Sequence, residues 1–177
     1  MKKYIPSFQA KSIYDIDLDF FKNNGFRYLF LDLDNTLDGP HTTVPSLRAI
    51  ELINKMKEIG LVPIILSNNK KKRVYRYAEP LNIEFIYRAF KPFPFAIKKY
   101  IKSRKIDVDS SIIIGDQIMT DIFCANNAHI KSLLTERLTK KDQIITFINR
   151  KIDEHFRKKI LKNKLAFDWR EYYAKHQ

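Results

Sequence analysis

The stretch Leu29–Leu37 reads Leu-Phe-Leu-Asp-Leu-Asp-Asn-Thr-Leu and closes an apolar run with two aspartates, Asp32 and Asp34. Residues two apart in a strand face the same side, so both carboxylates can be turned toward one ligand. Carboxylates this close repel each other and favour a cation or a shared proton between them. An apolar strand does not need such a pair for its stability, so the pair predicts chemistry at this point of the chain.

Short apolar segments alternate with helical patterns along the rest of the chain. We expect strands over residues 28–33, 61–66, 83–87, 111–114 and 130–134, and helices over 46–59, 70–78, 93–102 and 119–127. This alternation is typical of a parallel sheet covered by helices on both faces. The predicted fold class is α/β: a three-layer α/β/α sandwich with a five-stranded, mainly parallel, Rossmann-like sheet. Residues 1–25 are expected to form a lead-in segment with an amphipathic piece near Asp17–Asn24.

Polar side chains follow these strands at the points where they end. The carboxyl ends of parallel strands meet at one edge of the sheet, where open α/β folds bind their ligands. Carboxylate oxygens suit Mg²⁺, and the absence of histidine and cysteine among these residues argues against zinc. A hydroxyl and a lysine in the same set favour an anion, so we predict a phosphoryl site. Its expected members are Asp32, Asp34, Ser67, Asn68, Lys91 and Asp116.

Such a set is able to hydrolyse a phosphate ester. One carboxylate can attack phosphorus and form an aspartyl-phosphate intermediate. The neighbouring Asp34 could protonate the leaving oxygen and then activate the hydrolytic water. Magnesium reduces the repulsion between carboxylate and phosphate, while Lys91 stabilises the charge of the transition state.

Four motifs, in order and each after a strand, resemble those of haloacid-dehalogenase-type (HAD) phosphatases. They are Asp32-Leu33-Asp34-Asn35-Thr36 for the first motif, Ser67 for the second, Lys91 for the third and Gly115-Asp116-Gln117-Ile118-Met119-Thr120-Asp121 for the fourth. Together with Ser12–Ile16, Ser67-Asn68-Asn69 and Lys91-Pro92, they resemble the type IIIA, YqeG-like branch, which is grouped with phosphatidylglycerophosphate phosphatases.

The resemblance implies a role for each matching residue. Asp32 would be the nucleophile and a Mg²⁺ ligand, and Asp34 the acid/base with its main-chain carbonyl on the metal. The phosphoryl group would be held by Ser67, Asn68 and Lys91, and the metal set completed by Asp116. Asp121 would support the site, and Thr36 would orient the loop or simply cap a local turn. Outside the motifs, Asp38 is expected to be a solvated loop residue, whereas Arg73, Tyr75 and Tyr77 could line the mouth or pack at its rim.

The spacing between motifs leaves no room for a separate cap domain. There are 32 residues between Asp34 and Ser67 and 23 between Ser67 and Lys91, and the expected helices and strands occupy most of them. We therefore expect one domain over residues 1–177, with an open catalytic core at about 26–136 and a basic helical extension at about 139–177. An open site admits a large or membrane-embedded phosphate ester.

The charge balance is strongly basic. The chain holds 33 lysines and arginines against 20 acidic residues, a net charge of +13. This excess favours an anionic partner, although lysine enrichment also reflects genomic composition and solubility. With one cysteine, Cys124, expected to be a buried thiol, and no apolar run of the roughly 18 residues that a membrane span needs, we expect a cytoplasmic protein. The inner face of the membrane is the alternative location.

The tail combines basic charge with an amphipathic pattern. Residues 140–177 carry eleven basic and five acidic side chains. An isoleucine-rich stripe could pack on the sheet, or the basic helix could lie on anionic lipid with Trp169, Tyr172 and Tyr173 as anchors. The stripe consists of Ile145, Ile148, Ile152, Phe156 and Ile160.

The leading functional hypothesis is a Mg²⁺-dependent phosphatase that converts phosphatidylglycerophosphate to phosphatidylglycerol. The alternatives are a phosphatase of soluble nucleotides, sugar phosphates or phosphoproteins, and a basic RNA- or ribosome-associated protein on the same scaffold. No RNA-binding motif is present, so nucleic acid is not the expected partner. The oligomeric state cannot be read from the sequence.

Overall fold

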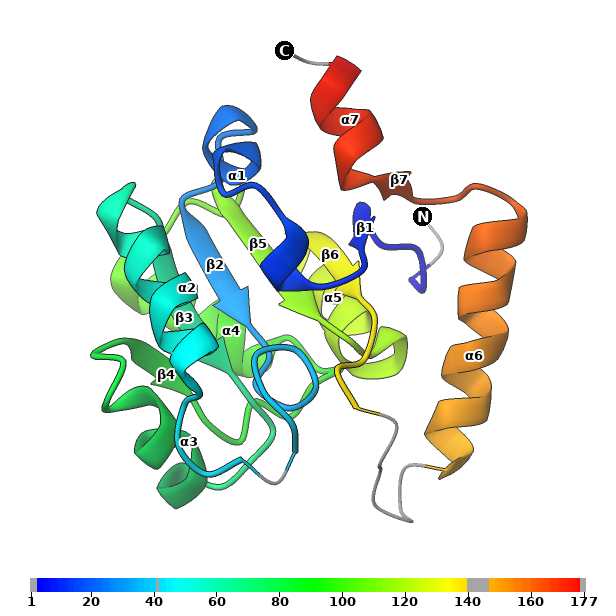
Figure 1. The fold of residues 1–177 in the computed structure, drawn as a ribbon. Helices are drawn as coiled ribbons and strands as arrows, with labels where there is room; N and C mark the ends of the chain where they lie inside the picture. Colours follow the sequence, from blue (N-terminus) through cyan, green and yellow to red (C-terminus); the bar gives the residue numbers. More distant parts are fainter. Residues whose placement is uncertain (1–2, 41, 140–146, 176–177) are drawn as a thin grey trace.

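The computed structural model describes residues 3–40, 42–139 and 147–175 and is built on a seven-stranded sheet (Figure 1). Every neighbouring pair of strands is parallel. The strand order is β4 (Glu84–Ile86), β3 (Val62–Leu66), β2 (Tyr28–Leu31), β5 (Ser111–Gly115), β6 (Lys131–Thr135), β1 (Phe8–Ala10) and β7 (Phe167–Asp168). The α/β class with its parallel sheet is therefore confirmed.

Alternate residues of the central strands build two separate cores. In β2, Leu29 and Leu31 point into one core, which also takes residues from α1 (Asp19–Asn23), α2 (Leu47–Glu58), α3 (Lys71–Ala78) and α7 (Trp169–Lys175). Phe30 points to the other face, where α4 (Phe95–Arg104) and α5 (Phe123–Ala128) pack. Burial on both faces explains why the strands read as continuous apolar runs. The result is the predicted three-layer sandwich.

Local signals account for the helix boundaries near the site. The side chain of Ser46 caps α2 by accepting a hydrogen bond from the Ala49 main chain at 3.3 Å. The same helix stops before Gly60, whose φ of +86° suits a residue without a β-carbon. After β5 the expected helix at 119–127 is divided into a π-helical turn, η2 (Ile118–Ile122), and α5.

The sheet has two more strands than the five expected, and both come from the ends of the chain. Strand β1 lies in the expected lead-in, which also forms a short 3₁₀ turn, η1 (Ile13–Asp15), and α1. Strand β7 lies in the tail and pairs with β1. Strands of three and two residues are too short to show a period in the sequence. They exist because β6 provides main-chain partners for β1, and β1 in turn provides them for β7.

The tail continues the fold around the edge of the sheet. Helix α6 (Phe147–Lys162) packs against η2 and β6 through Phe156 and the buried Ile160. Trp169 is 5% exposed and touches Phe20, so it is a core residue rather than a membrane anchor. The side chains of Ile145 and Ile148 lie outside the described residues. Among the helices of the described ranges, none is long and apolar enough to span a membrane.

Candidate active site

The carboxyl ends of β2, β3 and β5 meet at a small cavity of about 190 Å³. Asp32 follows β2, Ser67 follows β3 and Asp116 follows β5, as the sheet topology requires. Lys91 enters from the loop between β4 and α4. The topology thus brings these predicted residues to one edge. The cavity is lined by Asp32, Asp34, Ser67, Asn68, Asn69, Lys91, Gln117 and Thr120.

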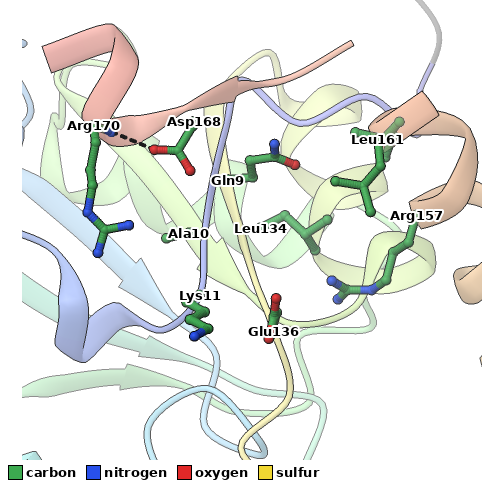
Figure 2. Close-up of a pocket in the computed structure, with 10 residues that line it drawn as sticks. Gln9, Ala10, Lys11, Leu134, Glu136, Arg157, Leu161, Asp168 and Arg170 are labelled. Atoms are coloured by element: carbon green, nitrogen blue, oxygen red, sulfur yellow. Dashed lines mark hydrogen bonds between the residues drawn. The ribbon is translucent and has the colours of Figure 1, made fainter. Parts of the chain in front are cut away.

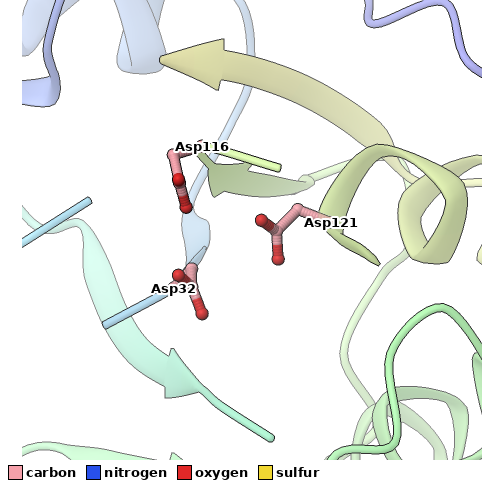
Figure 3. A group of neighbouring side chains, drawn as sticks. All are labelled: Asp32, Asp116 and Asp121. Atoms are coloured by element: carbon pink, nitrogen blue, oxygen red, sulfur yellow. The ribbon is translucent and has the colours of Figure 1, made fainter. Parts of the chain in front are cut away.

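Three buried carboxylates converge at this edge (Figure 3). Asp32, Asp116 and Asp121 each offer an oxygen within 4.8 Å of the other two. Asp116 is fully buried, and neither of its carboxylate oxygens has a hydrogen-bond partner among the described residues. Buried carboxylate oxygens that accept no hydrogen bond are costly, and a divalent cation with oxygen ligands offsets that cost. The donor set therefore fits Mg²⁺.

The backbone of Gly115 makes room for the third carboxylate. A β-carbon at this position would overlap the carboxylate of Asp121, which lies directly against the glycine. The main-chain N–H of Gln117 donates to Asp121 Oδ2 at 3.0 Å and holds the side chain in place. The end of β5 and the turn of η2 thus position Asp116 and Asp121 together.

Lys91 neutralises part of this negative charge. Its Nζ donates hydrogen bonds at 2.6 Å to Asp32 and to Asp121, and at 2.9 Å to the carbonyl of Leu66. Burial alone would lower the pKa of this lysine, but the two carboxylates outweigh it and raise the pKa well above its usual range. Lys91 is therefore a permanent cation at the wall of the cavity.

The remaining carboxylate charge is still unfavourable. Burial, together with Asp121 and Asp34, raises the pKa of Asp32 to about 7 despite the pull of Lys91. Burial and the carboxylates of Asp32 and Asp121 raise the pKa of Asp116 well above its ordinary value, against the effect of Arg137 and Arg157. Without a metal, burial and the neighbouring carboxylates thus shift both side chains toward the protonated form relative to an ordinary aspartate, as expected of a cation site.

Asp34 lines the same cavity and has two partners of its own. Arg73 in α3 forms an ion pair with it, and Asn69 Nδ2 donates to it at 2.6 Å. Arg73 thus belongs to the site. From the sequence, it was expected either to line the mouth of the site or to pack at its rim. Its signal was only its place in the first turn of α3, six residues after Ser67. Tyr77 is buried, and Tyr75 is exposed.

Two amides organise the second and third motifs. Asn69 donates from its main chain and its side chain to Ser67 Oγ, at 3.2 and 3.1 Å. Because Ser67 Oγ accepts both bonds, its own O–H can donate to an anion. The amide of Asn68 exchanges hydrogen bonds with the main chain of Lys91 at 2.8 and 3.0 Å. Asn68 thus positions Lys91, and phosphate binding by Asn68 stays a prediction.

The turn after the first motif corrects one expectation. Asp38 is buried, and its carboxylate accepts hydrogen bonds from Ser46 N at 3.0 Å and Tyr77 Oη at 2.6 Å. The prediction of a solvated loop residue was wrong, because α2 and α3 close over this turn. Asn35 adopts φ +65° and donates to the Asp38 carbonyl at 2.7 Å. Thr36 is buried, and its Oγ1 has no hydrogen-bond partner among the described residues.

Helix α6 is attached to the fourth motif by charged side chains that no sequence motif predicted. Asp153, 2% exposed, accepts from Ile118 N at 2.6 Å and from Arg157 Nε at 3.0 Å. Arg157 also donates to the carbonyls of Asp116 and Thr135. Arg137 lies 3.4 Å from the carboxylate of Asp116 and 3.6 Å from that of Asp153. The tail therefore contacts the loop of the fourth motif directly.

A larger cavity of about 610 Å³ lies beside this network (Figure 2). It is lined by residues of β1, β6, β7 and α6, and Arg157 is common to it and to the network. Both signs of charge line it, and the carboxylates of the three-aspartate group are not among its lining residues. Those lining residues are Gln9, Ala10, Lys11, Leu134, Glu136, Arg157, Ile160, Leu161, Asp168 and Arg170.

Comparisons with known proteins agree with this geometry. A family model described as HAD-hydrolase-like matches residues 89–149, which include Lys91 and the fourth motif. The class defined by fold and site is thus that of the HAD-like hydrolases. "Probable phosphatase YqeG" of Bacillus subtilis (strain 168) is 33% identical over 173 residues, covering 96% of this chain and 98% of that protein. The chain therefore belongs to the family of YqeG-like HAD phosphatases.

Solved structures share the fold at low sequence identity. An uncharacterised protein from Listeria monocytogenes is 16% identical with a TM-score of 0.52, over 67% of this chain and 86% of that one. The cobalt-bound deoxy-D-mannose-octulosonate 8-phosphate phosphatase of Haemophilus influenzae is 14% identical with a TM-score of 0.50, over 76% and 89%. At such identity the likeness establishes the fold alone.

Proposed function

We propose that this phosphatase is a Mg²⁺-dependent phosphomonoester hydrolase that forms an aspartyl-phosphate on Asp32. The observation that carries the proposal is the buried contact of Lys91 with Asp32 at 2.6 Å, beside two further carboxylates. One oxygen of Asp32 is bound by Lys91, which leaves the other for attack on phosphorus. The cationic lysine also offsets the charge of an incoming phosphate dianion.

In the first proposed step, an oxygen of Asp32 forms a bond to phosphorus and the ester P–O bond breaks. Asp34 donates a proton to the departing oxygen, and Ser67 and Lys91 hold the oxygens of the phosphoryl group. In the second step, Asp34 takes a proton from water while the water oxygen attacks phosphorus. The bond to Asp32 then breaks, and inorganic phosphate is released with the carboxylate regenerated.

We propose that the metal is held by Asp32, Asp116 and the main-chain carbonyl of Asp34. When bound, Mg²⁺ supplies positive charge that offsets repulsion between carboxylate and phosphate. Asp121 acts on Lys91, with which it shares a hydrogen bond of 2.6 Å. Arg73 forms an ion pair with Asp34 in the free protein. The leaving group must therefore take the place of Arg73 beside Asp34.

For the substrate we propose phosphatidylglycerophosphate. A cavity of about 190 Å³ accommodates a phosphoryl group and leaves the remainder of the ester outside. In the described residues between β2 and β4, α2, β3 and α3 follow one another without an inserted cap domain. An uncapped site suits a phosphate group presented by a large assembly such as a membrane. The resemblance of the motifs to phosphatidylglycerophosphate phosphatases points the same way.

Phosphate release from an aryl phosphate tests the chemistry. We expect turnover with Mg²⁺ that is lost with a chelator and falls on the order of 10³-fold or more in Asp32→Asn. Asp109→Asn, an exposed aspartate remote from the three-carboxylate group, is the matched control and should retain activity. Full activity in Asp32→Asn, or turnover without any divalent metal, contradicts the proposal.

A substrate panel tests the lipid assignment separately. Phosphatidylglycerophosphate in mixed micelles should release phosphate faster than nucleotides, sugar phosphates or phosphopeptides at equal concentration. Equal or faster release from one of the soluble esters would assign the phosphatase to that class instead. Because all substrates use the same site, Asp32→Asn must abolish each reaction.

A further inference from the structure

Three phenylalanines beside Lys91 are exposed to solvent. Phe90, Phe93 and Phe95 have 67%, 58% and 75% of their surface accessible. The rings of Phe93 and Phe95 stack with centroids 6.2 Å apart. We call these three residues the aromatic rim. Large apolar side chains gathered on one surface are costly in water and mark a contact with another body.

The aromatic rim is not a defect in the packing of α4. This helix already buries Ile97 and Ile101 against the sheet, at 1% and 7% exposure. Phe95 begins the helix, and Phe90 and Phe93 precede it in the loop from β4. The core is therefore complete without these rings, which leaves them available to an external partner.

The surroundings of the aromatic rim are strongly basic. Residues 68–78 contain five basic and no acidic side chains, and residues 85–106 contain seven basic and none acidic. Arg73 and Lys91 face the site, but the others in and near the two loops are exposed. We call the exposed set the basic belt. It consists of Lys70, Lys71, Lys72, Arg88, Lys98 and Lys99.

Main-chain hydrogen bonds hold the two loops next to each other and to the cavity. The N–H of Arg88 donates to the carbonyl of Asn69 at 2.9 Å, and that of Ala89 donates to Ser67 at 3.0 Å. Asn68, Asn69 and Lys91 line the cavity itself. The aromatic rim and the start of the basic belt therefore flank the mouth through which a phosphate ester must enter.

We infer that the aromatic rim and the basic belt dock the protein on an anionic lipid bilayer, with the mouth of the active site facing the headgroups. Apolar rings that enter the interface and cations that meet anionic lipid are the two components of peripheral membrane binding. This inference rests on the proposed function, because the docked face presents that same site to a lipid phosphate. It places the contact near β4, at the opposite sheet edge from β7 and the basic tail (Figure 1).

Co-sedimentation with vesicles tests the surface. The full chain should bind vesicles of phosphatidylcholine mixed with phosphatidylglycerol, and bind weakly to phosphatidylcholine alone or at high salt. Phe93→Ser and Phe95→Ser should each weaken partitioning about tenfold, and the double variant about a hundredfold. Phe167→Ser, which removes a ring of similar exposure at the other edge of the sheet, is the matched control and should bind as the unchanged protein does.

Further variants separate the basic belt from the tail, and the docking from the chemistry. Changing Lys70, Lys71 and Lys72 to glutamine should weaken binding to anionic vesicles, whereas Lys158→Gln with Lys159→Gln should not. The Phe93 and Phe95 variants should hydrolyse aryl phosphate at the normal rate. The inference is overturned if the changes at Lys158 and Lys159 weaken binding and those at Lys70, Lys71 and Lys72 do not. It is also overturned if the surface binds a protein partner in place of vesicles. Absence of vesicle binding in a protein that hydrolyses aryl phosphate refutes docking alone, whereas absence of hydrolysis refutes the proposed function.

Discussion

Lys91 shows how a single residue can hold a reactive site together. A buried lysine and a buried carboxylate are each unfavourable alone, and their pairing offsets the loss of hydration. Here one ammonium group serves Asp32 and Asp121, while Asp116 is left without a hydrogen-bond partner among the described residues. The arrangement fits a site that is completed by a cation and by a phosphate.

At the same scale, Gly115→Ala tests the packing of the fourth motif. The new methyl group would overlap the Asp121 carboxylate, which must then move away from Lys91. We expect a loss of about 2 kcal/mol or more in the free energy of unfolding. We also expect a fall of roughly 10²-fold in kcat. Urea denaturation and aryl phosphate kinetics measure the two effects.

Gly25→Ala serves as a comparison for Gly115→Ala, because a β-carbon there meets no atom within 4 Å. Its φ of +75° makes the change unfavourable for the backbone, so it should cost stability without affecting kcat. Normal kcat in Gly115→Ala would contradict the positioning role given to Asp121.

Helix α6 contacts the loop of the fourth motif, a role that the sequence did not predict. Its Asp153 and Arg157 connect the tail to the main chain of the loop that carries Asp116. If Asp116 is a metal ligand as proposed, removing such orienting groups should change metal affinity by about 10- to 100-fold. The element is therefore a support for the active site as well as a cover for the sheet.

Replacing Asp153 separates its charge from its hydrogen bonds. Asp153→Asn keeps an oxygen that can accept from Ile118 N but removes the partner charge of Arg157. We expect the Mg²⁺ concentration for half-maximal activity to rise about tenfold, with a smaller change in kcat at saturating Mg²⁺. Asp153→Ala should have the larger effect on both the required Mg²⁺ concentration and kcat, because it also removes the acceptor for Ile118 N. An unchanged Mg²⁺ requirement in both variants would reduce α6 to a packing element.

The whole molecule should couple its stability to pH through the raised pKa values. Because the pKa of Asp32 is raised to about 7 and that of Asp116 is also raised, the metal-free folded state binds more protons than the unfolded chain above their ordinary pKa values. This contribution is therefore fully present in acid and is lost as the pH rises through about 4 to 7. A cation that binds the ionised carboxylates restores the lost stability.

Thermal unfolding with Mg²⁺ or with a chelator measures this coupling. At a tenfold excess over its Kd, Mg²⁺ adds about 1.4 kcal/mol to the free energy of unfolding. The rise in Tm at fixed Mg²⁺ should be larger at about pH 8 than at about pH 5, since protons compete for the same oxygens. Asp32→Asn should reduce this difference between the Tm rises at the two pH values. Equal shifts at both pH values would argue against a carboxylate cation site.

Much of the fold was predictable because its central strands are buried on both faces. Such strands must be apolar throughout, so β2, β3 and β5 are visible as runs in the sequence. Because parallel strands end at one edge, the order of strands and motifs along the chain is enough to place Asp32, Lys91 and Asp116 near one another. The short edge strands β1 and β7 carry no such signal, since main-chain pairing with neighbours distant in the chain creates them.

The sequence by itself determined which functional groups stand at the ends of the strands, because local motifs specify them. Only the tertiary structure decided how those groups are supported. Arg73, Asp153 and Arg157 reach partners 35 to 41 residues away along the chain, and no local pattern encodes such contacts. The exposure of Phe90, Phe93 and Phe95 was likewise decided there, since whether a ring is buried depends on what the completed fold packs against it.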